Sequence, residues 1–353
     1  MDGIDAVLVD LADSTPAIIA ADTFEWPPTL REQLQAAARG TFLTAEQFAR
    51  LDAETGIAFA EAAKRIITGH RHDQIVAIGS HGQTLAHAPQ ASPGYSLQLG
   101  CPARIVEGTG ITTVADFRRR DIAAGGQGAP LVPAFHEGIF RSKDETRVIL
   151  NIGGIANITC LPAAPGSDVT GFDTGPGNCL MDSWVQQQLG QPFDQNGAFA
   201  AQGNTNDKLL KQLLEDPYFA TPPPKSTGTD YFSGQWLRQQ LGSTTGPAQD
   251  IQATLLQLCA SSISQAIKDF CRPAPDRVLV CGGGAHNPPL MKALDDLLPC
   301  PVEDTEVHGM SPDWVEATAF AWLAKQTLEN KPGNLPSVTG ARGPRVLGAI
   351  YPA

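Results

Sequence analysis

Short apolar runs alternate with longer amphipathic stretches along this chain. Residues 6–9, 75–78, 112–115, 148–150 and 277–281 are each rich in Val, Ile, Leu or Ala and end at a polar residue or glycine, which predicts buried strands. A further strand is expected to follow the glycine turn after residue 150 and to run through Ile158.

Helices are predicted between these strands from spacing and end signals. Thr44 and Gln47 form a capping-box pattern ahead of a helix through about residue 67. Apolar residues recur at helical spacing over residues 250–270, and another helix is expected near 288–298. Ser311 as N-cap and Pro312 at the first helical position predict a last helix through residue 328. This alternation indicates an α/β fold.

The length of the chain indicates two domains. It has 353 residues, which exceeds the usual size of a domain with a single compact core, and 42 % of these residues are apolar. The boundary is expected between residues 130 and 147. This gives a first domain of residues 1–135 and a second of residues 136–353, whose C-terminal tail could return to the first domain.

Charge and cysteine content narrow the class of protein. The formal net charge of −12 argues against a nucleic-acid partner or an anionic membrane surface. Seven cysteines without a CxxC spacing indicate reduced thiols in a cytoplasmic protein. The sequence has no apolar stretch of the roughly 20 residues that a membrane span needs, and its start does not resemble a secretory signal.

Two of three glycine-rich turns are the candidate phosphate-binding loops. Residues 151–157 (Asn-Ile-Gly-Gly-Ile-Ala-Asn) lie between two predicted strands, and residues 281–287 (Cys-Gly-Gly-Gly-Ala-His-Asn) lie between a strand and a helix. Glycines let backbone N–H groups approach phosphate oxygens closely. The alternatives are a tight hairpin for the first turn and, for His286 in the second, a loop residue without a catalytic role.

The third turn, residues 171–178 (Gly-Phe-Asp-Thr-Gly-Pro-Gly-Asn), carries the candidate general base. Asp173 ends an apolar run, and Asn178 can cap the next helix. A carboxylate at a strand end is well placed to accept a proton. The alternative is an Asp that stabilises the turn by bonding its own backbone.

The first half of the chain holds a second polar group. Ser80-His-Gly-Gln-Thr84 and Asp116-Phe-Arg118 each follow a predicted strand, and glycines crowd residues 125–128. Arg118 could bind a carboxylate or a phosphate with its forked donors. The alternative is a run of surface arginines paired with Asp116 and Asp121. The glycines suit a close-fitting substrate loop or a crossover between domains.

Taken in order, these blocks resemble those of the 1,6-anhydro-N-acetylmuramic acid kinase family over the whole chain. The resemblance rests on residues 80–84, 116–118 with 123–133, 151–157, 171–178, 225–228, 250–254, 281–287 and 314–316. It implies two actin-like (ribonuclease H-like) domains around a nucleotide cleft, as in the actin/hexokinase/Hsp70-like superfamily, and a protein that is typically a homodimer.

The resemblance also implies a reaction. The family uses ATP, expected with Mg²⁺, and water to convert the small anhydro-sugar of murein recycling into N-acetylmuramic acid 6-phosphate. Asp173 then matches the catalytic base, and Gln83, Arg118 and Glu316 match the sugar side. The expected ATP-binding residues are Asp2, Gly3, Asp5, Asn151, Gly153, Gly154, Asn157, Gly175, Gly177, Asn178, Gly282, Gly283 and Gly284. The sequence does not identify the Mg²⁺ ligands.

The sequence departs from the family pattern in two places. Thr229 and Asp230 stand where the family usually has Arg-Glu. The family opens with a strand and then Gly-Thr-Ser-x-Asp-Gly-x-Asp, of which only Asp2-Gly-Ile-Asp5 is matched. We therefore expect the first domain to lack its initial strand and first phosphate loop.

Two other functions fit parts of the pattern. A non-catalytic sugar-binding or regulatory member would explain a short first domain. A kinase or ATPase of the same superfamily with another substrate would be expected to differ in the 80–84 and 116–118 blocks.

Overall fold

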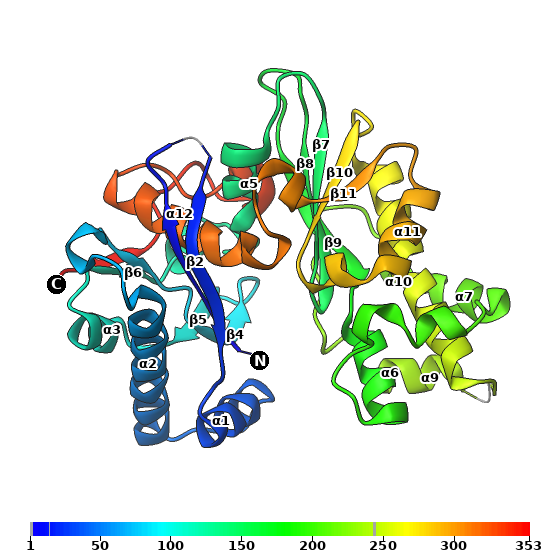
Figure 1. Ribbon diagram of the computed structural model, residues 1–353, viewed down its shortest axis with the longest axis horizontal. Helices are drawn as coiled ribbons and strands as arrows, with labels where there is room; N and C mark the ends of the chain where they lie inside the picture. Colours follow the sequence, from blue (N-terminus) through cyan, green and yellow to red (C-terminus); the bar gives the residue numbers. More distant parts are fainter. Residues whose placement is uncertain (1–2, 14, 243–244) are drawn as a thin grey trace. The chain divides into compact units, whose positions relative to one another are not determined.

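The computed structural model describes residues 3–13, 15–242 and 245–353. The chain divides into two compact units (Figure 1), and each is described by itself. Unit 1 consists of residues 1–139 and 314–353, and unit 2 consists of residues 140–313.

Unit 2 is built on one mixed sheet of five strands. Its order is β11 (Val302–Asp304), β10 (Arg277–Cys281), β7 (Arg147–Ile152), β8 (Ile155–Leu161) and β9 (Thr170–Pro176). β10 runs parallel to β7 and β11, whereas β7, β8 and β9 form an antiparallel meander. Parallel β7 and β10 therefore end at the same edge of the sheet, with Asn151 paired to Cys281.

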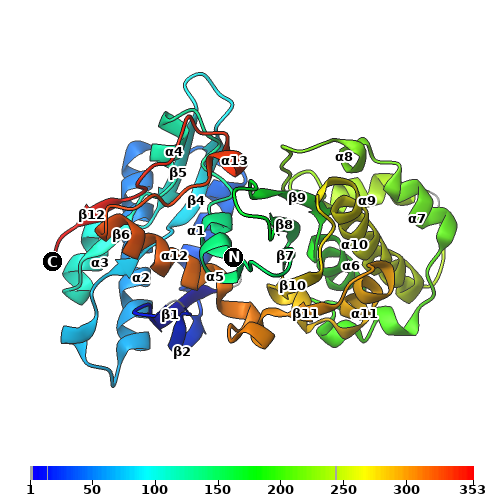
Figure 2. The ribbon, with the colours of Figure 1, turned by 90° about the horizontal axis from the view of Figure 1, so that it is seen from above.

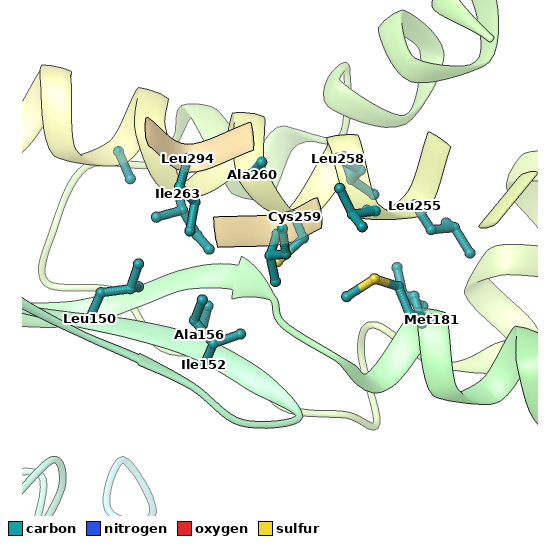
Figure 3. Packing of buried hydrophobic residues seen from close by; sticks show 14 of the residues in the cluster. Leu150, Ile152, Ala156, Met181, Leu255, Leu258, Cys259, Ala260, Ile263 and Leu294 are labelled. Atoms are coloured by element: carbon teal, nitrogen blue, oxygen red, sulfur yellow. The ribbon is translucent and has the colours of Figure 1, made fainter. Parts of the chain in front are cut away.

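Two helices cover one face of this sheet. α10 (Ala248–Phe270) and α11 (Pro288–Leu297) pack on β7 and β8 through the alternate residues that point to that side. Figure 3 shows Leu150, Ile152 and Ala156 of the strands beneath Leu258, Cys259 and Ile263 of α10. Each of these six side chains is buried, so this face is the main core of unit 2. The other helices of unit 2 are α6 (Cys179–Leu189), α7 (Asp207–Leu214), α8 (Pro217–Ala220) and α9 (Gly234–Leu241).

Unit 1 contains three separate sheets among its described residues. They are the hairpin β1 (Ile4–Asp10) with β2 (Ala17–Phe24), the hairpin β4 (Gln83–Ala88) with β5 (Tyr95–Leu99), and the sheet β12 (Ala349–Tyr351), β6 (Thr113–Ala115), β3 (Ile78–Gly79). The helices are α1 (Pro28–Ala38), α2 (Ala45–Ile67), α3 (Pro102–Thr109), α4 (Arg119–Ala123), α5 (Val132–Phe140), α12 (Val315–Leu328) and α13 (Pro336–Thr339). Figure 2 shows the red C-terminal strand β12 beside β6 of the first half.

A cavity of about 1240 Å³ separates the β1–β2 hairpin from β3. It is lined by consecutive residues of each segment, 3–12 and 74–83, with α2 and α12 as walls. The side chains of consecutive strand residues point to opposite faces of the sheet. A cavity that is lined by every residue of a strand must therefore run along the edge of that strand. Among the described residues, β1 pairs only with β2 and β3 only with β6. Among its described residues, unit 1 therefore has two unpaired strand edges on one cavity.

The α/β class expected from the sequence is confirmed, and so are most elements. α2 begins with the expected capping box, since Gln47 N–H donates to Thr44 Oγ1 and Thr44 N–H to Gln47 Oε1. β7, β8, β10 and α10 lie within two or three residues of their predicted bounds. Only residues 78 and 79 of the run that begins at 75 are in a strand, because one edge of this segment lies on the cavity and has no strand to pair with.

The start of the last long helix differs from the prediction. Residues 312–314 form a 3₁₀ turn, and α12 begins at Val315. The Pro312 carbonyl accepts a hydrogen bond from Gly282 N–H at 2.9 Å. Because this carbonyl is bonded to another loop, the α-helical ladder starts later.

The C-terminal segment packs with the first half of the chain. Phe320 and Leu323 of α12 share a core with Val114 and Phe117 near β6, and β12 pairs with β6. Residues 314–353 therefore belong to unit 1, whereas the sequence analysis grouped them with the second domain and left a return of the tail open.

The expectation of reduced thiols throughout is wrong for one pair of cysteines. Cys160 on β8 and Cys271, which directly follows α10, form a disulfide with their Cα atoms 6.0 Å apart. The two residues are 111 positions apart in sequence, so no local spacing could indicate the pair. Among the described residues, Cys101, Cys179, Cys259, Cys281 and Cys300 form no disulfide.

Within the described residues, no helix combines the length and the apolar character needed to cross a membrane.

Candidate functional site

A row of polar side chains crosses the sheet of unit 2. In the register of the strands, Asn151 on β7 pairs with Asn157 on β8, which pairs with Asp173 on β9. Residues paired across strands point to the same face. Their neighbours Ile152, Ala156 and Phe172 are buried in the core of the opposite face, so the three polar residues share the face away from α10. The structure thus brings together three residues that the sequence predicted separately.

Asp173 is the central acidic group of this row. Its Oδ2 accepts a hydrogen bond from Thr227 N–H at 3.0 Å, and its backbone carbonyl accepts one from the Tyr218 hydroxyl at 2.7 Å. Burial raises the pKa of this carboxyl to about 6, although the Thr227 N–H acts in the opposite direction. A carboxyl with a pKa near neutrality and one fixed donor suits a general base.

The predicted glycine turns are interlocked beside this row. Asn178 N–H donates to Gly153 O at 2.8 Å, and Gly177 N–H donates to Gly154 O at 3.0 Å. A Cβ on Gly177 would lie 2.4 Å from Gly153 O. The two turns therefore fit together only because position 177 has no side chain.

The third glycine turn lies against the first one. Gly282 has a φ of +79°, and a Cβ there would lie 2.4 Å from Asn151 Oδ1. Gly283 and Gly284 then open a short 3₁₀ turn, Gly283–His286. The sequence predicted that the Asn178 side chain caps α6, and this cap does not form. Asn178 Nδ2 donates instead to Ile152 O at 3.2 Å.

The glycine turns suit the phosphate groups of a nucleotide. The glycines leave backbone close to the surface at the ends of β7 and β10, where N–H groups can meet phosphate oxygens. Among residues 3–13, 15–242 and 245–353 there is no group of three or more His, Cys, Asp or Glu side chains that could hold a metal.

The remaining candidate residues lie in unit 1, around Arg118. Its Nη2 and Nε lie 2.7 Å and 3.2 Å from His81 Nε2, and its Nη1 donates to Gly128 O at 2.8 Å. Burial and the neighbouring guanidinium lower the pKa of His81 to about 3, so its Nε2 is a hydrogen-bond acceptor at neutral pH. Arg118 is half-buried and held on two sides, which excludes the alternative of a free surface arginine.

Gly3, Asp5, Gln83 and Glu316 all line the large cavity of unit 1. Incomplete solvation raises the pKa of Glu316, Arg118 lowers it, and Asp5 raises it again. Asp5 Oδ1 also accepts a hydrogen bond from Thr23 Oγ1 at 2.6 Å. The structure therefore gathers these four residues and Arg118 in one region of unit 1. Asp2 lies outside the described residues.

Asp121 fixes the loop that holds Arg118. This carboxylate is fully buried and accepts hydrogen bonds from Gly128 N–H at 2.7 Å, Asn334 Nδ2 at 2.6 Å and Thr339 Oγ1 at 2.8 Å. The glycine-rich segment 125–128 is thereby tied to the C-terminal segment.

The sequence analysis missed three residues of these two groups. His81 stood inside a quoted motif but received no role, and Asp121 was considered only as a surface partner of the arginines. Lys225, whose backbone carbonyl accepts a hydrogen bond from Asp173 N–H, was cited only as part of a block. A buried acidic or basic side chain can be recognised only when its partners are known, and Asn334 and Thr339 lie more than 200 positions from Asp121.

Comparison with known proteins gives the following. A family model described as anhydro-N-acetylmuramic acid kinase matches residues 1–353. Anhydro-N-acetylmuramic acid kinases of Xanthomonas campestris and Xylella fastidiosa are each 52 % identical, over all of this chain and 94 % of the relative. That of Coxiella burnetii is 48 % identical over 99 % of this chain and 94 % of the relative. Among solved structures, a ROK family glucokinase from Streptomyces griseus in complex with glucose and AMPPNP matches with a TM-score of 0.40 and 13 % identity, over 92 % of this chain and 100 % of that chain.

Proposed function

Because the chain belongs to the anhydro-N-acetylmuramic acid kinase family, we propose that it opens 1,6-anhydro-N-acetylmuramic acid with water and phosphorylates O6, with Asp173 as the base. The observation that carries this proposal is the Asp173 carboxyl, held by Thr227 N–H beside three glycine turns. Asp173 lies in the middle of β9 rather than at the strand end expected from the sequence, because β9 continues to Pro176. The family supports a catalytic protein over a non-catalytic sugar-binding one.

Asp173 accepts the proton in this reaction. A water oxygen attacks the anomeric carbon and gives its proton to Asp173, and the bond from that carbon to O6 breaks. The electron pair remains on O6, which accepts a phosphoryl group. One carboxylate suffices, because phosphorus rather than a proton captures the leaving oxygen.

The glycine turns hold the nucleotide in this proposal. When bound, ATP supplies the phosphoryl group, and Mg²⁺ offsets its negative charge. The residues for the phosphates and nucleoside are those of the three turns and, in unit 1, Gly3 and Asp5. Tight turns exclude side chains from the ligand surface, so backbone N–H groups face it.

Arg118 and Glu316, with Gln83, form the sugar side. The lactyl group of the substrate carries a carboxylate, which suits a guanidinium fork. His81 and Gly128 O fix two sides of the Arg118 guanidinium, so little side-chain freedom is lost when the sugar binds. We also propose that the protein acts in the cytoplasm as a homodimer, a state that light scattering after size exclusion would test.

The test of this function is product analysis. The purified chain is incubated with ATP, Mg²⁺ and anhydro-N-acetylmuramic acid in water enriched in ¹⁸O. We expect a sugar 6-phosphate with one ¹⁸O at the anomeric position, and ADP in equal amount. Phosphorylation of N-acetylglucosamine or glucose instead would assign another substrate.

The rate should fall at acidic pH. The base must be ionised to accept a proton, and burial raises the pKa of Asp173 to about 6 in the folded protein. As pH decreases through this value the ionised fraction decreases, so kcat/KM should drop about tenfold per pH unit below it. A profile of kcat/KM for the sugar from pH 4.5 to 8 measures this, and a rate unchanged down to pH 4.5 would exclude Asp173 as the base.

An Arg118→Ala variant should weaken sugar binding more than ATP binding. Loss of a bidentate ion pair is expected to raise the KM for the sugar about 10- to 100-fold, with a change of less than about threefold for ATP. Arg120→Ala is the matched control, because Arg120 is exposed on α4. Equal weakening of both ligands would move Arg118 to the phosphate side.

A further inference from the structure

Lys225 is a buried lysine near the base. Its residue is only 9 % exposed, and its Nζ donates to the carbonyls of Tyr218 at 3.2 Å and Phe219 at 3.3 Å. The ammonium also lies 4.8 Å from the ring centroid of Tyr218, 5.6 Å from that of Phe270 and 5.9 Å from that of Phe172. Aromatic faces and carbonyls stabilise a cation in place. Burial lowers the pKa of Lys225, and the electrostatic attraction of the nearby Asp269 carboxylate raises it against that effect.

These contacts join three segments of unit 2. Tyr218 belongs to α8, Phe270 is the last residue of α10, and Phe172 on β9 directly precedes Asp173. The lysine therefore connects the loop after α8 to the strand that carries the base and to the main core helix.

The backbone around Lys225 holds Asp173 directly. Asp173 N–H donates to Lys225 O at 3.3 Å, and Thr227 N–H, two residues further on, donates to Asp173 Oδ2 at 3.0 Å. Tyr218 contacts both residues. Its backbone carbonyl accepts a hydrogen bond from Lys225 Nζ, and its hydroxyl donates one to Asp173 O. Movement of the 225–227 backbone would therefore move the donor of the carboxylate.

We propose that Lys225 is a positioning residue for the Asp173 base: its ammonium anchors the 225–227 backbone so that Thr227 N–H stays on Asp173 Oδ2. This inference rests on the proposed function for its catalytic consequence. The geometry itself can be tested without substrate. Within unit 2, the titratable groups that adjoin Asp173 in these contacts are Tyr218 and Lys225, and Asp269 acts electrostatically on Lys225.

The experiment follows the Thr227 amide by NMR while the pH is varied. In the parent, the amide proton should shift as Asp173 titrates, because its acceptor changes charge, and Asp173→Asn should abolish the shift. In Lys225→Met we expect this titration to disappear, kcat to fall about 10- to 100-fold as expected for a misplaced catalytic group, and the KM for ATP to change less than about twofold.

Lys268→Met is the matched control, since it removes the same charge from an exposed lysine on α10 and should leave both readouts as in the parent. A folded Lys225→Met protein whose Thr227 amide still titrates with Asp173 would overturn the proposal.

If that variant does not fold, Lys225→Arg, which keeps a cation and N–H donors, takes its place. There kcat and the amide titration should decrease together, and a loss of kcat with an unchanged amide titration would equally overturn it. If the amide result holds while no sugar is phosphorylated, only the proposed function fails.

Discussion

An Asp173→Asn variant should fold like the parent and lose about two to four powers of ten in kcat, the usual contribution of a positioned general base. Asparagine has nearly the same shape, and its amide oxygen can still accept the Thr227 N–H that now bonds Oδ2. The amide cannot take a proton from water, so only the chemical step is affected. Steady-state rates together with a thermal melt measure both effects.

Asp168→Asn provides the control for this change. Asp168 is exposed in the loop between β8 and β9, so the same substitution there should leave kcat within about twofold, as for most surface changes. A folded Asp173→Asn protein that keeps more than about a tenth of the parent rate would show that the base is another group.

The second large effect concerns the cavity of unit 1. We expect a strand-forming segment followed by Gly-Thr-Ser, fused ahead of Met1, to enter the cavity and to pair with the free edges of β1 and β3. Each new hydrogen bond contributes about 0.5–1.5 kcal/mol, so five or six bonds should raise the melting temperature by roughly 10–20 °C. Amide hydrogen exchange should slow selectively in β1 and β3.

ATP turnover should rise with the same fusion, because the added Gly-Thr-Ser brings further N–H and hydroxyl donors for phosphates. A fusion with proline at alternate positions of the added strand is the control, since proline cannot donate to a ladder. If the chain without an extension melts cooperatively and is fully active, the prediction that the cavity needs an added strand is contradicted. It would mean that Gly3, Asp5 and the glycine turns of unit 2 suffice for the phosphates.

Local signals in the sequence predicted the local structure well. The Thr44–Gln47 capping box forms as expected, because both hydrogen bonds join residues three positions apart. The glycine turns around Asn151 and Gly282 were recognised for a similar reason, whereas β9 continues past Asp173 to Pro176, so the turn predicted directly after Asp173 begins later. A tight turn needs glycine because of its own backbone angles, whatever surrounds it in the fold. The positions of such turns can therefore be recognised from the residue types alone.

Features that depend on distant partners could not be predicted in this way. The disulfide of Cys160 with Cys271 joins residues 111 positions apart. The 3₁₀ start of the last helix depends on Gly282, some thirty residues earlier. The role of Lys225 depends on three aromatic rings that come from three separate elements. Each of these is a property of packing rather than of a motif.

The return of residues 314–353 to unit 1 has a consequence for the order in which the protein is made. Unit 2 is one continuous stretch, so it can fold as soon as it has left the ribosome. Unit 1 receives α12, β12 and the Asn334 and Thr339 partners of Asp121 only after unit 2 has been synthesised. At about 5–20 residues per second, the first 139 residues wait roughly 10–40 s for them. The unit that is synthesised first is therefore completed last, and during that interval the buried acceptors of Asp121 and the apolar surface around Val114 are open to chaperones.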